Sequence, residues 1–373
     1  MLLNKKYEID MCSGAILPKM LLFAIPLMCS SILQLLFNAA DIIVVGRYAG
    51  DNSLAAVGSN TPLIGLLTNL FIGLSIGTNV LAARYYGAKA EEDLAKTVHT
   101  SMVLGIVSGL FLSVAGIAGA RRILIWMQTP EEVLGLATLY LVIYFLGMTA
   151  MMVYNFGSAI LRAVGDTRRP LYYLVAAGII NVILNLFFVI NLRLDVAGVA
   201  IATVISQCVS ALLVVRCLLR EGGGIRLVPS MMRIDRAKLA QILKIGLPAG
   251  IQGVLFSLSN VVIQSSINSF GAVIDAGMQR LWILCSTYVL CGMMDGMVGT
   301  LRGLGYSVLP TVVTLLGACG LRLVWIATLF QAEAFHTVTT VYLSYPVSWA
   351  VTFGVHVLCF RWIMTKRLLV RKL

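Results

Sequence analysis

The residue of this sequence with the clearest potential for chemistry is Asp41, a carboxylate within the otherwise apolar run of residues 33–50. Gln34, Asn38 and Asp41 are spaced at i, i+4 and i+7, so a helix would carry all three on one face. An ionisable group inside a membrane is costly and commonly marks an ion or substrate path. The alternative interpretation is a structural acid that is hydrogen-bonded to asparagines.

A second polar pair, Asn181 and Asn185, is spaced at i, i+4 in another apolar run. We expect this stripe to meet that of Asp41 inside the first half of the chain. Carboxylate and amide oxygens are hard ligands that suit Na⁺, whereas a lone desolvated carboxylate suits a proton. The two asparagines also have a purely structural interpretation, since intramembrane amides hold helices together.

The composition shows what kind of element positions these residues. Hydrophobic residues make up 59% of the chain and charged residues 12%, against about 25% charged in ordinary soluble domains. With a mean hydropathy of +0.93, this predicts a polytopic membrane protein with the lipid bilayer as its partner. The eight cysteines form no CxxC pair and the three histidines are isolated, so we expect neither an enzyme nor a cofactor.

Ten apolar segments are long enough to span a bilayer, which needs roughly 20 residues for a helix. They lie near residues 17–45, 54–82, 97–119, 132–158, 170–190, 195–217, 239–269, 276–300, 307–330 and 338–362. Alternating the loops puts 22 of the 28 Lys and Arg residues on one side and 4 on the other. By the positive-inside rule both termini are cytoplasmic. The net charge of +12 therefore reports topology, and no nucleic-acid partner is expected.

The sequence contains a parallel internal repeat. Residues 161–170, LRAVGDTRRP, recur as residues 301–310, LRGLGYSVLP, at an offset of 140. The segment beginning at Ala24 matches the one beginning at Ile245 at an offset of 221 to 222, which pairs Pro26 with Pro248. Repeated bundles of this kind are common in transporters.

The change of offset between Gly271 and Val273 means that the second copy lacks counterparts of residues 51–132. We therefore predict an all-α fold of two helical lobes with a central cavity, built as six helices followed by four where twelve are expected. The predicted domains are an N-terminal lobe at 1–221, a cytoplasmic linker at 222–238 and a C-terminal lobe at 239–373.

The repeat points to three candidate residues in the second lobe. Asn260 occupies the repeat position of Asn38, and Asp295 occupies that of Asn155. Arg322 falls inside a span and needs a counter-charge or backbone carbonyls. We expect Asp41 to be nearer to it in depth than Asp295.

The run NAADIIVVGRYAG, the segment IATVISQ at 201–207 and the duplicated LR-x-x-G…P turn together resemble the multidrug and toxic compound extrusion (MATE) family. The resemblance implies a bacterial inner-membrane antiporter, here expected to be a monomer, that exports small organic cations in exchange for H⁺ or Na⁺.

What the resemblance implies about the site is a cation-coupling set in the first lobe. Its members are Asp41, Gln34, Asn155, Asn181, Asn185 and Thr203, with a possible Na⁺ at Asp41. Asn185 departs from the family pattern, because many relatives have Asp at this position. Two alternatives are a non-transporting truncated remnant and a lipid-linked sugar flippase of the same superfamily.

Overall fold

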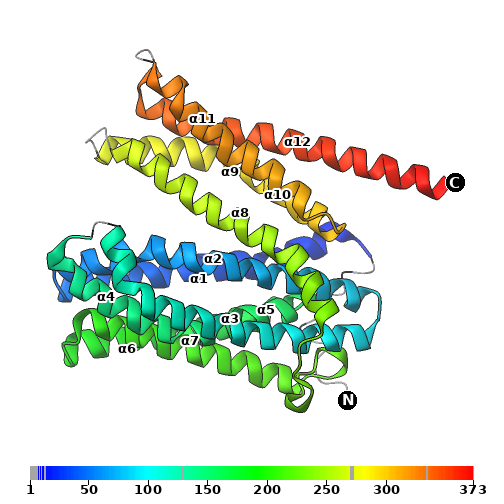
Figure 1. Ribbon diagram of the computed structural model, residues 1–373, viewed down its shortest axis with the longest axis horizontal. Coiled ribbons are helices and arrows are strands. Elements are labelled where there is room, and N and C mark those ends of the chain that lie inside the picture. The colour runs from blue at the N-terminus through cyan, green and yellow to red at the C-terminus, as the bar shows by residue number, and fades with distance from the viewer. Residues whose placement is uncertain are drawn as a thin grey trace. The chain divides into compact units, whose positions relative to one another are not determined.

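The computed structural model describes residues 14–127, 129–268, 273–332 and 335–372, together with Tyr7, Ile9 and Met11. Within the helices, side chains are not described at residues 16, 51, 59, 61, 62, 260–282, 285, 338 and 366–372. All the regular secondary structure in the described residues is helical (Figure 1). The chain divides into two compact units, Met1–Leu243 and Lys244–Leu373.

Unit 1 is a bundle of long apolar helices joined by short connections. Its helices are α1 (Ile16–Tyr48), α2 (Asp51–Gly87), α3 (Glu91–Trp126), α4 (Glu131–Leu146), α5 (Met148–Ala163), α6 (Arg168–Leu186), the π-helical turn η1 (Phe187–Asn191) and α7 (Asp195–Arg220). Short 3₁₀ turns, η2 (Gly223–Ile225) and η3 (Pro229–Met231), follow α7. The buried core, which includes Met102, Phe145 and Phe156, draws on α1 to α5 and on α7.

Unit 2 has fewer helices. It comprises most of α8 (Arg236–Asn268), then α9 (Val273–Gly303), α10 (Val308–Thr314), the π-helical turn η4 (Leu315–Gly320), α11 (Leu321–Ala327), the 3₁₀ turn η5 (Leu329–Gln331) and α12 (Val338–Lys372). Met294 of α9 packs with Tyr345 and Trp349 of α12 in its buried core.

The expectation of an all-α polytopic membrane protein is confirmed. In the described part of the chain, eight helices are long and apolar enough to cross a membrane, and α4 with α5 forms a ninth span that bends by 47°. The tenth expected span falls in α9, where many side chains lie outside the described residues. The expected junction in the repeat also lies outside them at Gly271.

The two copies of the repeated turn have the same backbone conformation. Gly165 and Gly305 adopt φ values of +88° and +94°, in the left-handed region that favours glycine. The Gly165 N–H donates to the Arg162 carbonyl at 3.0 Å, and the Gly305 N–H donates to the Arg302 carbonyl at 2.9 Å. The repeat seen in the sequence is therefore also a repeat of local structure.

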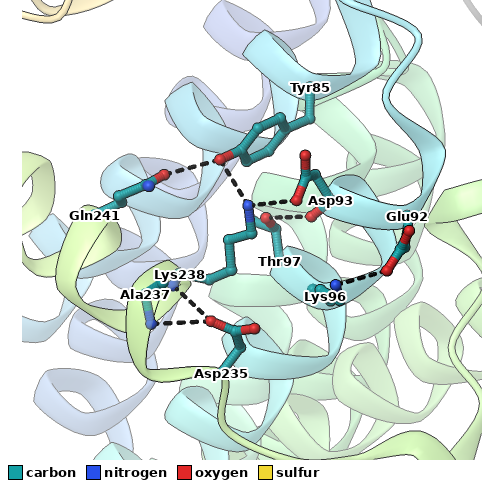
Figure 2. A network of polar contacts seen from close by, with 9 residues as sticks. All are labelled: Tyr85, Glu92, Asp93, Lys96, Thr97, Asp235, Ala237, Lys238 and Gln241. Atoms are coloured by element: carbon teal, nitrogen blue, oxygen red, sulfur yellow. Dashed lines mark hydrogen bonds and ion pairs between the residues drawn. The ribbon is translucent and has the colours of Figure 1, made fainter.

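The glycine-rich linker packs on unit 1 through a polar network (Figure 2). Lys238 Nζ pairs with Asp93 Oδ1 at 2.7 Å and donates to the Tyr85 hydroxyl at 2.7 Å. Tyr85 in turn donates to Gln241 Oε1 at 2.9 Å. The compact first unit therefore extends through the linker and into the first turns of α8, ending at Leu243.

Asp235 caps the first turn of α8 within the same network. The backbone N–H groups of Lys238 and Ala237 donate to its Oδ1 at 3.0 and 2.9 Å, and the Asp235 N–H donates to Thr100 Oγ1 at 3.0 Å. A side chain that accepts from the second and third helical N–H groups satisfies donors that the helix itself leaves unpaired. These bonds, chiefly the one from Lys238, hold the pKa of Asp235 below its usual value.

Close approach between α1 and α6 is made possible by Gly178. A Cβ at this position would lie 1.9 Å from the Phe37 ring, so only glycine fits in this arrangement. Phe37 and Asp41 are one helical turn apart on α1, and Gly178 and Asn181 are nearly so on α6. The contact therefore brings the polar stripes of the two helices together.

Replacing Asp235 should make the thermal stability of the protein less sensitive to acid. Because the folded-state pKa is lowered, the ionised cap stabilises the fold above the unfolded pKa of about 3.9, and this contribution is lost as the pH falls through the folded value. We expect Asp235→Ala to lower the unfolding midpoint near neutral pH, with a smaller difference from the parent in acid. Asp235→Asn, which keeps a capping oxygen, is the control. Parallel midpoints for parent and Asp235→Ala at every pH would contradict this.

Candidate functional site

The carboxylate of Asp41 is tied to helix α6 by an amide. Asn185 Nδ2 donates to Asp41 Oδ1, and the same nitrogen lies 3.3 Å from Asn181 Oδ1. Asn181 Nδ2 donates to Thr203 Oγ1 on α7 at 3.4 Å, and the Thr203 hydroxyl donates to the Val199 carbonyl at 2.9 Å. A polar chain thus links α1, α6 and α7 inside unit 1.

The residues of this polar chain are buried to different degrees, and one of their oxygens has no hydrogen-bond partner in the described residues. Asn185 is 1% exposed and Asn181 is 5% exposed, whereas Asp41 is partly buried. Asn185 Oδ1 is buried and has no hydrogen-bond partner among the described residues. An unpaired buried acceptor beside a carboxylate is an oxygen set that a small cation or a proton donor can complete.

Two tyrosines that the sequence pattern does not single out lie near Asp41. Tyr140 and Tyr144 of α4 stack with ring centroids 5.9 Å apart, and both are within electrostatic range of the Asp41 carboxylate. Their i, i+4 spacing is visible in the sequence, but tyrosines in apolar helices usually mark the membrane interface. Here Tyr140 is buried, with 7% exposure, and its phenol lies within electrostatic range of Asp41 in the polar chain.

Two predicted members of the first-lobe set lie apart from the chain. Gln34 is exposed on α1, and no hydrogen bond joins it to Asp41 in the described residues. Asn155 Nδ2 donates to the Met151 carbonyl of its own helix at 2.9 Å. The structure therefore brings together four of the six predicted residues.

The second-lobe candidates form no comparable cluster in the part of the chain that is described. Asp295 is exposed on α9, within electrostatic range of Arg302. Asn260 lies in α8, but its side chain is outside the described residues.

Arg322 is fully enclosed by uncharged groups of unit 2. Its Nε donates to Ser348 Oγ at 2.8 Å, and its guanidinium carbon lies 4.2 Å from the centroid of the Tyr345 ring. Trp349 adds a second aromatic face at 5.6 Å. Cation–π contact and a hydroxyl thus surround a charge that is expected from the sequence to need a counter-charge or backbone carbonyls.

Comparison with known proteins places the chain in a family. The MatE family model matches residues 26–187, a range that contains Asp41 and the asparagine pair. The chain belongs to the MATE family.

Among curated MATE relatives, the probable multidrug resistance protein YoeA of Bacillus subtilis is 33% identical over 260 residues, covering 68% of this chain and 56% of the relative. The probable multidrug resistance protein YpnP of the same organism is 28% identical over 287 residues, covering 77% and 64%. The chain therefore spans about three fifths of the length of these MATE relatives.

The fold is similar to solved MATE structures. An outward-facing multidrug resistance MATE transporter of the MOP superfamily superposes with a TM-score of 0.84 at 19% identity, covering 96% of this chain and 98% of that one. A MATE crystal structure in complex with MaD3S gives a TM-score of 0.85 at the same identity and coverage. The two-lobed helical architecture expected from the repeat is thus shown for this chain.

A double-mutant cycle should detect the bond between α1 and α6. We expect Asp41→Leu and Asn185→Leu to couple by about 0.5–2 kcal/mol in the free energy of unfolding, because each residue loses its partner when the other is replaced. The matched cycle of Asp41→Leu with Asn155→Leu should show coupling near zero. Denaturant titration of the purified protein in detergent would measure both cycles. Equal coupling energies in the two would contradict the geometry.

Proposed function

We propose that this chain is a cation-coupled multidrug efflux antiporter that exports small organic cations by alternating access. The observation that carries the proposal is the Asp41 carboxylate, held within an apolar membrane helix by the Asn185 amide. The coupling ion is H⁺ or Na⁺, and the chain acts as a monomer. Its N-terminal lobe is residues 1–221, followed by the linker 222–238 and the second lobe 239–373.

Relatives support the substrate class. Two of them are named probable multidrug resistance proteins, and a further relative, from Staphylococcus saprophyticus, is named multidrug export protein MepA and is 24% identical over 284 residues. Organic cations suit a cavity whose polar chain is led by a carboxylate, because an ionised Asp41 attracts positive charge.

Coupling follows from competition for that carboxylate. An ionised Asp41 favours an organic cation nearby, and a proton or Na⁺ bound to Asp41 removes this attraction. For Na⁺, the carboxylate of Asp41 and the unpaired Oδ1 of Asn185 would supply hard oxygen ligands. For a proton, Asn185 still donates to the carbonyl oxygen of the neutral acid. In either case, binding of the ion and binding of the drug favour opposite-facing states of the protein.

The charge distribution supports a location in the bacterial cytoplasmic membrane with both termini inside the cell. The loops on the proposed cytoplasmic side hold 22 of the 28 Lys and Arg residues, including the linker that packs on unit 1. The positive-inside rule counts such short basic loops.

Replacing Asp41 should abolish ion-driven transport. Inside-out vesicles whose lumen is acidic or loaded with Na⁺ should take up a fluorescent organic cation when they contain the parent protein. We expect Asp41→Asn to reduce this uptake to that of vesicles without the protein, because a neutral side chain cannot exchange one cation for another. Glu131→Gln, which removes an exposed acid at the start of α4, should retain uptake. Absence of uptake by the parent under either gradient would favour the truncated-remnant interpretation.

Restoring a second acid at position 185 should strengthen the dependence on Na⁺. Two carboxylates in hydrogen-bonding contact cannot both ionise without a bound cation. For Asn185→Asp we expect the Na⁺ concentration for half-maximal uptake to fall by about tenfold, which corresponds to about 1.4 kcal/mol of added attraction. Asn155→Asp is the matched control, since Asn155 bonds only its own helix. An unchanged ion dependence in Asn185→Asp would count against Asp41 as the coupling site.

A further inference from the structure

Unit 1 contains a partly open cavity of about 170 Å³ that the proposed transport site does not use. It lies among α1, α2 and α5, where apolar walls from Phe23, Leu27 and Ile76 surround the polar side chains of Ser75, Asn79 and Arg162. Its volume is several times the roughly 30 Å³ that a water molecule occupies. The cavity can therefore hold a chemical group larger than one water.

Arg162 brings an uncompensated positive charge to this cavity. Its Nε is buried without a hydrogen-bond partner, and no ion pair to its guanidinium is found in the described residues. The ionisable group that interacts with it electrostatically is the Tyr154 phenol, whose hydroxyl donates to the Pro170 carbonyl at 3.1 Å. A buried guanidinium is costly unless an acceptor or an anion pairs with it.

A neighbouring arginine shows how the same region compensates a buried charge. Arg169, seven residues further along, pairs with the carboxylates of Asp166 and Glu221, and its Nη1 lies 3.2 Å from Cys217 Sγ. All these groups are internal to unit 1. Within the part of the chain that the structure describes, the fold thus supplies two carboxylates to Arg169 and none to Arg162.

The internal repeat shows which acceptor Arg162 lacks. Its repeat counterpart, Arg302, donates through Nη2 to Gln252 Oε1 of α8 at 2.6 Å. Gln252 corresponds to Ser30 of α1 at the offset of 222 that pairs the two prolines. Ser30 is too short to replace the amide, and its hydroxyl donates to the Pro26 carbonyl at 2.8 Å. The cavity is found in the lobe whose arginine lacks this amide.

The donor set of the cavity selects for an anion. Asn79 Nδ2 donates to the Ala159 carbonyl at 2.9 Å, and Ser75 Oγ donates to the Ile72 carbonyl at 2.7 Å. The donors left for a ligand are therefore the guanidinium of Arg162 and the second N–H of the Asn79 amide. The forked geometry of the guanidinium matches a carboxylate or a phosphate.

We propose that this cavity is a binding site for the anionic group of an amphiphile, namely an oxyanion that pairs with Arg162 while its apolar chain lies along Phe23, Leu27 and Ile76. The oxyanion has two possible sources, the phosphate of a membrane phospholipid and the carboxylate of a fatty acid. The residues that line this site are different from those of the Asp41 chain, so it is a second site in unit 1.

Binding can be measured on the full chain in detergent by native mass spectrometry. The probes are dihexanoylphosphatidylglycerol, decanoate, inorganic phosphate and the neutral dihexanoylglycerol. We expect one molecule of the phospholipid or of decanoate to be retained per chain, and the stronger of the two identifies the source. Inorganic phosphate and the neutral lipid should bind at least tenfold more weakly, because phosphate lacks the apolar chain and the neutral lipid lacks the oxyanion.

Three variants make the test specific. Arg162→Gln should weaken binding of the anionic amphiphile by about tenfold or more, whereas Arg302→Gln, the repeat counterpart with an internal partner, should leave it unchanged. Ser30→Gln should also weaken it, because the added amide supplies to Arg162 the acceptor that Gln252 supplies to Arg302. This last variant keeps the arginine and serves if Arg162→Gln fails to fold. Undiminished binding in a folded Arg162→Gln or Ser30→Gln protein, equal binding of the neutral lipid, or no retained ligand would overturn the proposal.

Discussion

The hydrogen bond from Asn185 to Asp41 is the interaction on which the arrangement of the first lobe depends. A bilayer offers no water to a buried carboxylate, so its partner must come from another helix. That requirement holds α1 against α6 and is met because Gly178 lets the ring of Phe37 lie close to the α6 backbone. The chain of amides continues to Thr203, so three helices share the constraint. Packing of apolar surfaces alone would leave their rotation about their axes far less defined.

The two copies of the repeat share a backbone and differ in side-chain chemistry. The turns at Gly165 and Gly305 have the same positive φ and the same hydrogen bonds. Around them, Arg302 finds an amide on α8, whereas Arg162 faces a cavity. A duplicated scaffold thus holds two equivalent arginines, of which one donates to an amide of its own lobe and the other lines a cavity.

The fold and the centre of the candidate site could be predicted from the sequence, because hydropathy and helical periodicity determine which residues share a face. Asp41 and Asn185 were selected on that basis. Periodicity does not say which neighbour a face meets, so it groups Gln34 with Asp41 although Gln34 is exposed. Asn155, which the family resemblance adds to the set, bonds its own helix. The tyrosine pair of α4 is not predicted from the sequence, because tyrosines in apolar helices usually mark the membrane interface and not a buried polar chain.

The division between the two units falls inside a helix. The glycines at 222–224 look like a flexible joint, yet the linker is fastened to unit 1 by Asp235 and Lys238. The first unit ends at Leu243, within α8, and Pro248 lies five residues further on. Proline has no N–H to donate, so the carbonyl of Lys244 loses its usual helical partner at the boundary itself. The hydrogen-bond ladder of α8 is thus interrupted at the carbonyl of Lys244, the first residue of the second unit.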